Sequence, residues 1–330
     1  MDSSAVPKVS VIIPLYNKAP YIKRALDSVF AQTVQDFEIV VVGGNSTDGG
    51  EDIVLGYSDP RIRFVKEAGK GVSAARNQGV DAARAELVAF LDADDEWLPE
   101  FLETILRLRE KWPDAGMYGT GYYTVGNDKN RVKANILKML SPTLKEGSIK
   151  NYFKEAIKYP KMIILTSGMV VNKKVFHDIG GFPCGYSQNE DRYLRAMIAL
   201  KYDIVYSPER KAIYHLELSE YDSRCQKYLS DPFAKYFDVN SSSLRDRDDY
   251  RDVLLFADGP RLSLSCANLV NGHDLKFIRE EIKKIKSKRL IVEKYTLYLL
   301  SYIPINNNIK LSIMLAMDYF RKIGLRIYLR

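Results

Sequence analysis

The sequence predicts an α/β fold: a mainly parallel sheet flanked by helices, followed by a mostly helical C-terminal region. Two observations support this prediction. In the first half, short apolar runs alternate with segments whose apolar residues recur at helical spacing, an order typical of β-α-β units. The apolar runs are unbroken, as expected for parallel strands that are buried on both faces.

The individual elements follow from these patterns. Strands are predicted over 9–15, 38–42, 61–65, 87–91, 117–125, 162–171 and 204–206. Helices are predicted over 21–31, 46–56, 73–84, 99–112, 175–179, 191–201, 275–288, 290–303 and 309–329, with a polar loop over 126–150. Ligands of such sheets bind beyond the carboxyl ends of the strands, which directs attention to the residues after each strand.

Composition and charge place the chain among ordinary globular proteins, with 330 residues, 46% of them hydrophobic and 28% charged. The net charge of +7 is uneven, because residues 251–330 hold 15 basic and 7 acidic side chains. A basic tail suggests an anionic partner such as a membrane surface. Nucleic acid is not expected, since no binding motif accompanies the charge.

Cysteine usage and the N-terminus indicate the compartment. Cys184, Cys225 and Cys266 are far apart and show no ligand spacing, so we expect free thiols in a reducing environment. The N-terminus lacks a signal peptide, and no apolar run reaches about 18 residues. We therefore expect a cytoplasmic protein, with peripheral contact to the inner face of a membrane as an open alternative.

Asp92, Asp94 and Asp95 form an acidic cluster directly after the predicted strand 87–91. Like charges at this range repel unless a cation neutralises them or water screens them. Oxygen ligands suit Mg²⁺ or Mn²⁺, which bridge protein carboxylates and substrate phosphates. The cluster therefore predicts a metal–diphosphate site, with a solvated turn before the next helix as the alternative.

Five segments in order carry a family resemblance. They are VSVIIPLYN at 9–17, EIVVVGGNSTD at 38–48, GVSAARNQG at 71–79, VAFLDADDEW at 88–97 and NEDRYLR at 189–195. Together they resemble the inverting family 2 glycosyltransferases of the GT-A fold over roughly residues 8–215. The resemblance implies a GT-A domain at 1–220, with a nucleotide-binding half at about 8–115 and an acceptor half at about 116–220. A basic, mostly helical region would then occupy 221–330.

The resemblance also implies roles for single residues. Donor-binding residues would be Pro14, Tyr16, Asn17, Asn45, Asp48, Arg76, Asn77, Asp92 and Ala93. Asp94, with Asp92 and His215, would hold Mn²⁺ or Mg²⁺, although a lone histidine is more often structural. Asp95 would be a second ligand or a structural hydrogen-bond acceptor.

Asp191 matches the family's general base, with Glu190 as the rival. In an inverting reaction the acceptor hydroxyl attacks the anomeric carbon from the face opposite the leaving diphosphate, and a nearby carboxylate takes its proton. The alternative interpretation of both acids is charge favoured at a helix N-terminus.

Gly43 and Gly44 depart from the family, which usually has two aspartates there, one of which commonly binds uracil. A UDP-sugar stays the favoured donor, with GDP- and dTDP-sugars as alternatives. The chain lacks the Gln-x-x-Arg-Trp motif of processive relatives, which favours transfer of a single sugar to a saccharide or lipid-linked acceptor.

Two other functions stay open at this point. One is an inactive nucleotide-sugar-binding scaffold, and the other is nucleotidyl transfer, which would need a glycine-rich phosphate loop after the first strand. The basic C-terminal region has three interpretations: membrane docking, a homodimer contact, or the solvated face of a helical subdomain.

Overall fold

The computed structural model describes residues 6–126, 144–159, 164–186, 188–215, 230–270 and 274–302. Most of the predicted loop over 126–150, the predicted helix 309–329 and Cys225 lie outside these residues. The chain divides into two compact units. The first comprises 1–152 with 161–224, and the second comprises 153–160 with 225–330.

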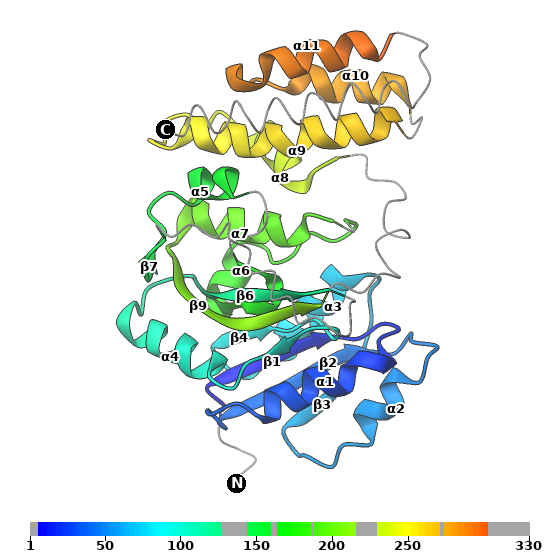
Figure 1. Cartoon of the computed structure of the whole chain (residues 1–330), viewed down its shortest axis with the longest axis vertical. Helices are drawn as coiled ribbons and strands as arrows, with labels where there is room; N and C mark the ends of the chain where they lie inside the picture. The colour runs from blue at the N-terminus through cyan, green and yellow to red at the C-terminus, as the bar shows by residue number, and fades with distance from the viewer. Residues whose placement is uncertain are drawn as a thin grey trace. The chain divides into compact units, whose positions relative to one another are not determined.

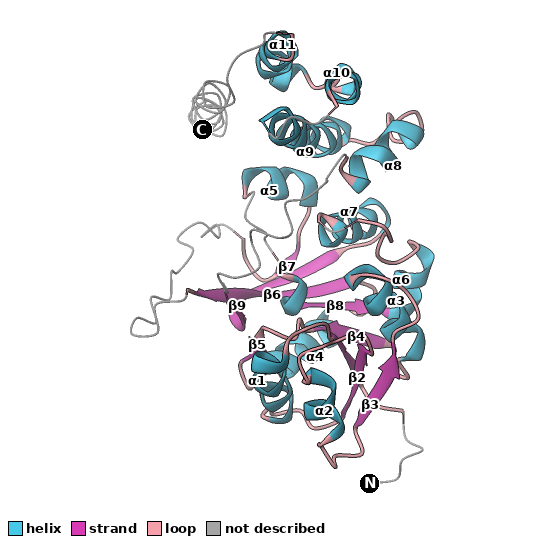
Figure 2. Ribbon diagram, turned by 90° about the vertical axis from the view of Figure 1, so that its right-hand side faces the viewer, coloured by secondary structure: helices cyan, strands magenta, loops and turns pink. Residues whose placement is uncertain are grey.

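The first unit is built on one mixed sheet with four parallel and four antiparallel strand pairs, of which the parallel pairs are the longer (Figures 1 and 2). Its strands are β1 (Val9–Pro14), β2 (Phe37–Gly43), β3 (Ile62–Lys66), β4 (Leu87–Phe90), β5 (Glu96–Trp97), β6 (Met117–Val125), β7 (Gly147–Ser148), β8 (Met169–Asn172) and β9 (Ile204–His215). Their order is β3-β2-β1-β4-β8-β6-β9-β5, and β7 pairs with β9. Strands β1 to β4 are parallel, as predicted, while β8 lies antiparallel between β4 and β6.

The helices of the first unit cover both faces of this sheet. They are α1 (Ala19–Phe30), α2 (Gly50–Leu55), α3 (Val72–Ala82), α4 (Phe101–Lys111), α6 (Lys173–Asp178) and α7 (Glu190–Lys201). Helices α1 and α4 share one apolar core with alternate residues of β1 and β2. Helix α3 lies on the opposite face, where a Cβ at Gly79 would come within 2.3 Å of Ile12 Cγ2. Only glycine therefore allows this close packing of helix on strand.

Glu38 is a fully buried charge at the start of β2. Ser10 donates a hydrogen bond to its carboxylate at 2.6 Å, and Arg63 and Arg84 pair with it at 3.0 and 2.8 Å. Burial raises the pKa of this carboxyl, but Ser10, the Arg84 amide and the two guanidinium groups outweigh burial and lower it below the ordinary value. The charge thereby fastens three strands and the segment after α3 at one end of the sheet.

Two predictions in the second half of the first unit were wrong in extent. Within 164–171, the described part of the strand predicted over 162–171, pairing begins only at Met169 in β8 (Met169–Asn172), because Thr166–Gly168 make a 3-10 turn. The strand predicted over 204–206 continues as β9 to His215. The middle of β9 is polar, so it lacks the apolar alternation from which a strand is predicted. The strand forms there because β6 and β5 pair with it.

The second unit is helical. It contains most of α5 (Tyr152–Lys158), with α8 (Pro232–Asn240), α9 (Tyr250–Val270), α10 (Leu275–Lys284) and α11 (Ile291–Leu300). An apolar core joins α9, α10 and α11. Beside it Arg261 is buried and pairs with Asp238, Asp258 and Glu281 at 2.7, 3.1 and 3.3 Å. Among the described residues, no helix is both long and apolar enough to cross a membrane.

Candidate active site

The acidic cluster follows β4, at the edge where the parallel strands present their carboxyl ends. Asp95 is fully buried and accepts hydrogen bonds from Ser167 Oγ at 2.5 Å and the His215 amide at 3.2 Å. Burial, reinforced by the charges of Asp92 and Asp94, raises its pKa well above the ordinary value. Of the two roles considered for Asp95, the structure shows that of hydrogen-bond acceptor, which ties the cluster to β9 and to the 3-10 turn.

Arg76 joins the acidic cluster to α7. Its guanidinium group is buried and donates to Asp92 Oδ1 at 2.6 Å through Nη2 and to Glu190 Oε1 at 3.1 Å through Nη1. The Phe182 ring lies 5.1 Å from the guanidinium carbon. Three residues distant in sequence, from α3, the end of β4 and the start of α7, thus form one ion-paired group.

Asp191 has a different cationic partner from its neighbour Glu190. Arg195, one turn later on α7 and equally buried, donates to Asp191 Oδ2 at 2.8 Å. The Arg192 amide donates to Oδ1 at 2.6 Å, and Thr166 Oγ1 lies 3.4 Å from Oδ2. Burial raises the pKa of Asp191, but Arg195, Arg76 and the amide outweigh burial and lower it below the ordinary value.

Glu190 behaves in the opposite way. Burial and the neighbouring charge of Asp191 raise its pKa, and the pairing with Arg76 only partly offsets them. The surroundings therefore move the pKa values of these two adjacent carboxyls apart. Asp191 is held ionised, and Glu190 is easier to protonate. Such separation is a frequent feature of sites that use one carboxylate as a base.

Asp94 contacts Lys18, the residue that precedes α1. Lys18 is almost completely buried, and its Nζ lies 2.8 Å from Asp94 Oδ2. Arg24, on α1, donates to the Asp94 backbone carbonyl. Asp92 and Asp94 thus each face a cationic side chain already in place.

These contacts bear on the predicted metal ion. Among the described residues, no three acidic, histidine or cysteine side chains form a group that could hold one. The carboxylate oxygens are nevertheless the donors that Mg²⁺ and Mn²⁺ prefer, and substrate phosphates commonly complete their shell. Asp94 therefore fits a divalent ion shared with a bound diphosphate, provided that the ion replaces Lys18.

His215 lies at the end of β9, close to the acidic run. Its Nε2 is 2.8 Å from Glu96 Oε1, across the pairing of β9 with β5. Its amide donates to Asp95. The His215 ring and the His215 amide therefore both have structural partners, and a metal-ligand role for His215 stays a prediction.

The predicted donor-binding residues after β1 and β2 form one connected loop pair. Asn17, with a positive φ of 49°, accepts a hydrogen bond from the Thr47 amide at 2.9 Å. Asp48 accepts the Ala19 amide at 2.7 Å and so fixes the start of α1. Tyr16, after Pro14 at the end of β1, is 62% exposed and leaves a free aromatic face. The structure thus gives Asn17 and Asp48 structural contacts and leaves Tyr16 accessible.

Gly43 and Gly44 leave little room for a side chain, because a Cβ at Gly43 would lie 3.1 Å from the Leu15 carbonyl oxygen. Gly44 has φ of 134°, and a Cβ there would lie 3.1 Å from the Lys66 side chain. The Gly44 and Ser46 amides both donate to Glu51 Oε1, at 2.8 and 2.9 Å. Thus a carboxylate does enter this loop, but it comes from α2 and is engaged by the backbone.

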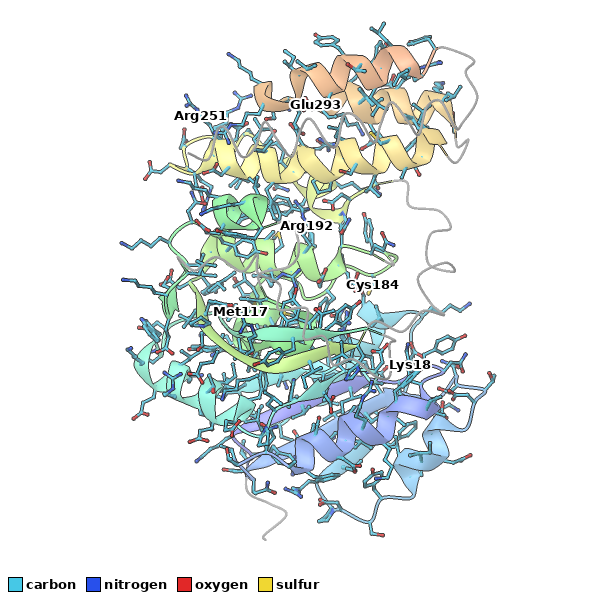
Figure 3. The ribbon with its side chains drawn as sticks, viewed as in Figure 1. Lys18, Met117, Cys184, Arg192, Arg251 and Glu293 are labelled. Carbon is cyan, nitrogen blue, oxygen red and sulfur yellow. The ribbon has the colours of Figure 1, made fainter. Side chains whose placement is uncertain are left out.

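Asn45 and Asn77 have fixed partners as well. The Asn45 Nδ2 donates to Glu67 Oε2 at 2.8 Å. The Asn77 side chain exchanges two hydrogen bonds of 2.9 Å with the Phe182 backbone, which anchors the segment before α7. Ala93 is buried between the aspartates. Figure 3 shows Lys18 and Cys184 on the same side of the first unit.

Sequence reasoning missed Lys18, Arg195 and Glu51. Arg195 was detectable in principle, because an arginine four residues after an aspartate on a helix lies within pairing distance. Lys18 directly follows the recognised Tyr16-Asn17 pair, but nothing in sequence spacing aims it at Asp94. Glu51 was hidden because its partners are backbone amides.

Comparisons with known proteins bear on the family and the fold of the chain. The family model described as glycosyl transferase family 2 matches residues 10–180. The chain is 41% identical over 125 residues to alr2836 of Nostoc sp., an uncharacterised glycosyltransferase, covering 37% of this chain and 39% of that one. It is 34% identical over 126 residues to EpsJ of Bacillus subtilis, covering 38% and 36% respectively. The chain thus matches about two fifths or less of the length of these curated relatives.

Solved structures extend the likeness to the whole fold. TarS 1–349 of S. aureus, in complex with UDP-GlcNAc, has a TM-score of 0.68 at 18% identity and covers 94% of this chain and 92% of its own. The mannosyltransferase PcManGT of Pyrobaculum calidifontis, with GDP-Man and Mn²⁺, has a TM-score of 0.52 at 18% identity, with 91% and 89% covered. At this identity the likeness concerns the fold, which is GT-A as predicted. With the family model matching more than half of its residues, the chain belongs to glycosyl transferase family 2.

Proposed function

We propose that this protein is an inverting, metal-dependent glycosyltransferase. It moves a single sugar from a nucleotide-diphosphate sugar to a hydroxyl of a saccharide or lipid-linked acceptor. One observation carries the proposal: buried Arg76 links Asp92 to Glu190, beside an Asp191 carboxylate that Arg195 keeps ionised. Positive charge for a diphosphate and a basic carboxylate for an acceptor therefore lie in one place.

Asp191 acts as the base in this proposal. An ionised carboxylate can accept the proton of an acceptor hydroxyl as that oxygen attacks the anomeric carbon. Its lowered pKa keeps it ionised at neutral pH, and Arg195 and the Arg192 amide fix its orientation. Glu190 is the weaker candidate, because its carboxylate is already engaged by Arg76 and its pKa is raised.

Asp94, with Asp92 beside it, would hold Mn²⁺ or Mg²⁺. When bound, such an ion supplies Lewis-acid stabilisation of the charge on the departing diphosphate. Arg76 contributes a fixed positive charge beside Asp92, 2.6 Å from its Oδ1. Lys18, released from Asp94, offers a further ammonium group for phosphate oxygens.

The donor is a UDP-sugar in the favoured form of the proposal, with GDP- and dTDP-sugars as alternatives. The structural neighbours support both a uridine and a guanosine donor, since TarS is in complex with UDP-GlcNAc and PcManGT with GDP-Man. The exposed ring of Tyr16 offers a stacking surface for a base. Because Gly43 and Gly44 carry no side-chain acceptor, contacts to the base would come from the backbone of this loop or from Asn45.

A binding experiment tests the donor site directly. The melting temperature is measured with UDP-, GDP- and dTDP-sugars, with and without Mn²⁺; ligand at 100 times its Kd stabilises by about 2.7 kcal/mol. Asp94→Ala should abolish the Mn²⁺-dependent part of the shift. Asp36→Ala is the matched control, because Asp36 is exposed and precedes β2, at the opposite end of the sheet.

The outcomes separate the competing functions. A donor that stabilises the protein and is consumed only when an acceptor is added supports transfer. A donor that binds without any transfer or hydrolysis over a panel of acceptors indicates a nucleotide-sugar-binding scaffold. If no nucleotide sugar changes the melting temperature in either condition, the donor site is refuted.

A further inference from the structure

The second unit carries an exposed apolar face on α11. The face consists of Ile291, Val292, Tyr295 and Leu299 of α11, with Tyr302 two residues past the end of the helix, and we call it the α11 stripe. All five are exposed, with Val292 at 71% and Leu299 at 63%. Val292, Tyr295 and Leu299 follow one another at three or four residues and Ile291 adjoins Val292, which places these four residues on one side of the helix. Figure 1 shows α11 beside α10 in this unit.

The opposite side of α11 makes the packing contacts. Leu297 and Leu300 are buried in the core that α11 shares with α9 and α10. By helical geometry, the stripe is centred about 180° from these two residues, so it faces away from that core. Glu293, labelled in Figure 3, is the sole acid of α11 and is half-buried outside the stripe. Single exposed apolar residues are ordinary, but a continuous stripe of five marks a binding surface.

Basic residues precede the stripe in the turn between α10 and α11. Lys286, Lys288 and Arg289 are exposed, and none of them has an acidic partner within the described part of the chain. This differs from α10, where Lys283 and Lys284 pair with Glu280 and Glu281 at 2.8 and 2.5 Å. Three uncompensated cations therefore lie at the N-terminal end of an uncharged apolar stripe.

We propose that the α11 stripe and the Lys286–Arg289 turn dock on an anionic membrane surface. The stripe supplies apolar area and two tyrosines, which favour the boundary between lipid headgroups and acyl chains. The three cations supply attraction to acidic headgroups. The charge of this face favours a bilayer over a second copy of this chain as its partner. Two copies that met through this face would bring two sets of unpaired cations together, and these would repel. This docking surface is independent of the proposed glycosyl transfer.

Vesicle co-sedimentation of the full chain tests the proposal. The protein is mixed with vesicles of phosphatidylcholine alone, or of phosphatidylcholine with phosphatidylglycerol. Binding is expected to the mixed vesicles and to weaken at high salt. Neutralising Lys286, Lys288 and Arg289 together to serine should lower the partition coefficient about 100-fold, since each cation contributes about fivefold.

The apolar part is tested separately. Val292→Ser combined with Leu299→Ser should reduce binding at least about tenfold, because the two side chains supply buried area at the bilayer. Val239→Ser is the matched control, since Val239 is 82% exposed in the same unit but lies on α8. Thermal melting checks that each variant is folded, which exposed positions should allow.

Two results would overturn the proposal. One is equal sedimentation of the wild type and both variants with mixed vesicles. The other is a dimer by light scattering that the Val292 and Leu299 substitutions convert to a monomer, without any vesicle binding by the wild type. The second result would assign the α11 stripe to a contact between copies.

Discussion

Replacing Asp191 with asparagine separates transfer from donor binding. The substitution keeps the shape of the side chain and removes its basicity, and a positioned general base typically contributes about 10²–10⁴-fold to the rate. The contacts of Arg76 with Asp92 and Glu190 do not involve Asp191, so donor affinity should be nearly unchanged. The rate of transfer is measured under single-turnover conditions, and the affinity for the donor is measured by calorimetry. The two measurements report the effect on catalysis and the effect on donor binding independently.

The substitution Asp191→Asn is also expected to lower the stability of the fold. Arg195 is buried with 4% of its side chain exposed, and it would lose its carboxylate partner at 2.8 Å. Breaking a buried pair on one side typically costs about 3–5 kcal/mol, whereas replacing both partners can be neutral. Asp191→Asn combined with Arg195→Met should therefore recover the melting temperature and stay inactive. Recovery of folding without recovery of transfer excludes instability as the cause of the lost activity.

The pH dependence supplies a second measurement. Because its folded-state pKa is lowered, Asp191 contributes stability above its unfolded pKa, and this contribution is lost as the pH falls through the folded pKa. The acid limb of kcat/KM should thus lie below the ordinary aspartate range in the wild type. Arg195→Met removes the strongest of the groups that lower the pKa of Asp191, so the limb should move to higher pH. A folded Asp191→Asn that retains a tenth or more of the wild-type rate would refute the base assignment.

Three further predictions concern other parts of the molecule. Lys18→Ala should tighten Mn²⁺ binding roughly tenfold by calorimetry without nucleotide, because the ammonium group competes for Asp94 at 2.8 Å; unchanged affinity would place the ion elsewhere. Gly44→Ala should lower the free energy of unfolding in urea by about 1–3 kcal/mol, given its φ of 134°, and no change would mean that the loop relaxes. Arg261→Met should cost about 3–5 kcal/mol because it leaves three carboxylates without their shared cation. The control Arg251→Met, at an exposed position, should stay within about 0.5 kcal/mol.

The sequence predicted the first part of the fold, up to about residue 115, closely, because its signals there are local. Strands β1, β2 and β4 are mainly apolar runs, β3 alternates apolar and basic residues, and α1 and α3 carry helical spacing between polar boundaries. The prediction was wrong around 162–171 and 204–206, where pairing partners decide the structure. Strand β9 includes the polar run Ser207–Lys211 and is held by β6 on one side and by β5 and β7 on the other. The sequence pattern of β9 itself does not reveal that these neighbouring strands pair with it.

The sequence singled out residues that the structure brings together, but it predicted their contacts less well. The strand-end rule located Asp92 and Asp94, and the motif order located Arg76 and Asp191. Which cation faces which carboxylate depends on distances that sequence spacing cannot give. Lys18 and Asp94 are 76 residues apart and lie 2.8 Å from each other. Contacts of this kind appear only when the sheet order is known.

The charges at the site indicate when a metal ion would bind. Asp92, Asp94, Glu190 and Asp191 pair with Lys18, Arg76 and Arg195, and Arg24 donates to the Asp94 backbone carbonyl. Setting aside Asp95, whose pKa is raised well above the ordinary value, these four carboxylates and four cations are equal in number before any ligand arrives. A nucleoside diphosphate adds about two negative charges, which a divalent ion offsets. We infer that donor and Mn²⁺ bind with positive coupling, so each should tighten the other by the same factor. Independent binding of the two, measured by calorimetry in both orders, would contradict this charge argument.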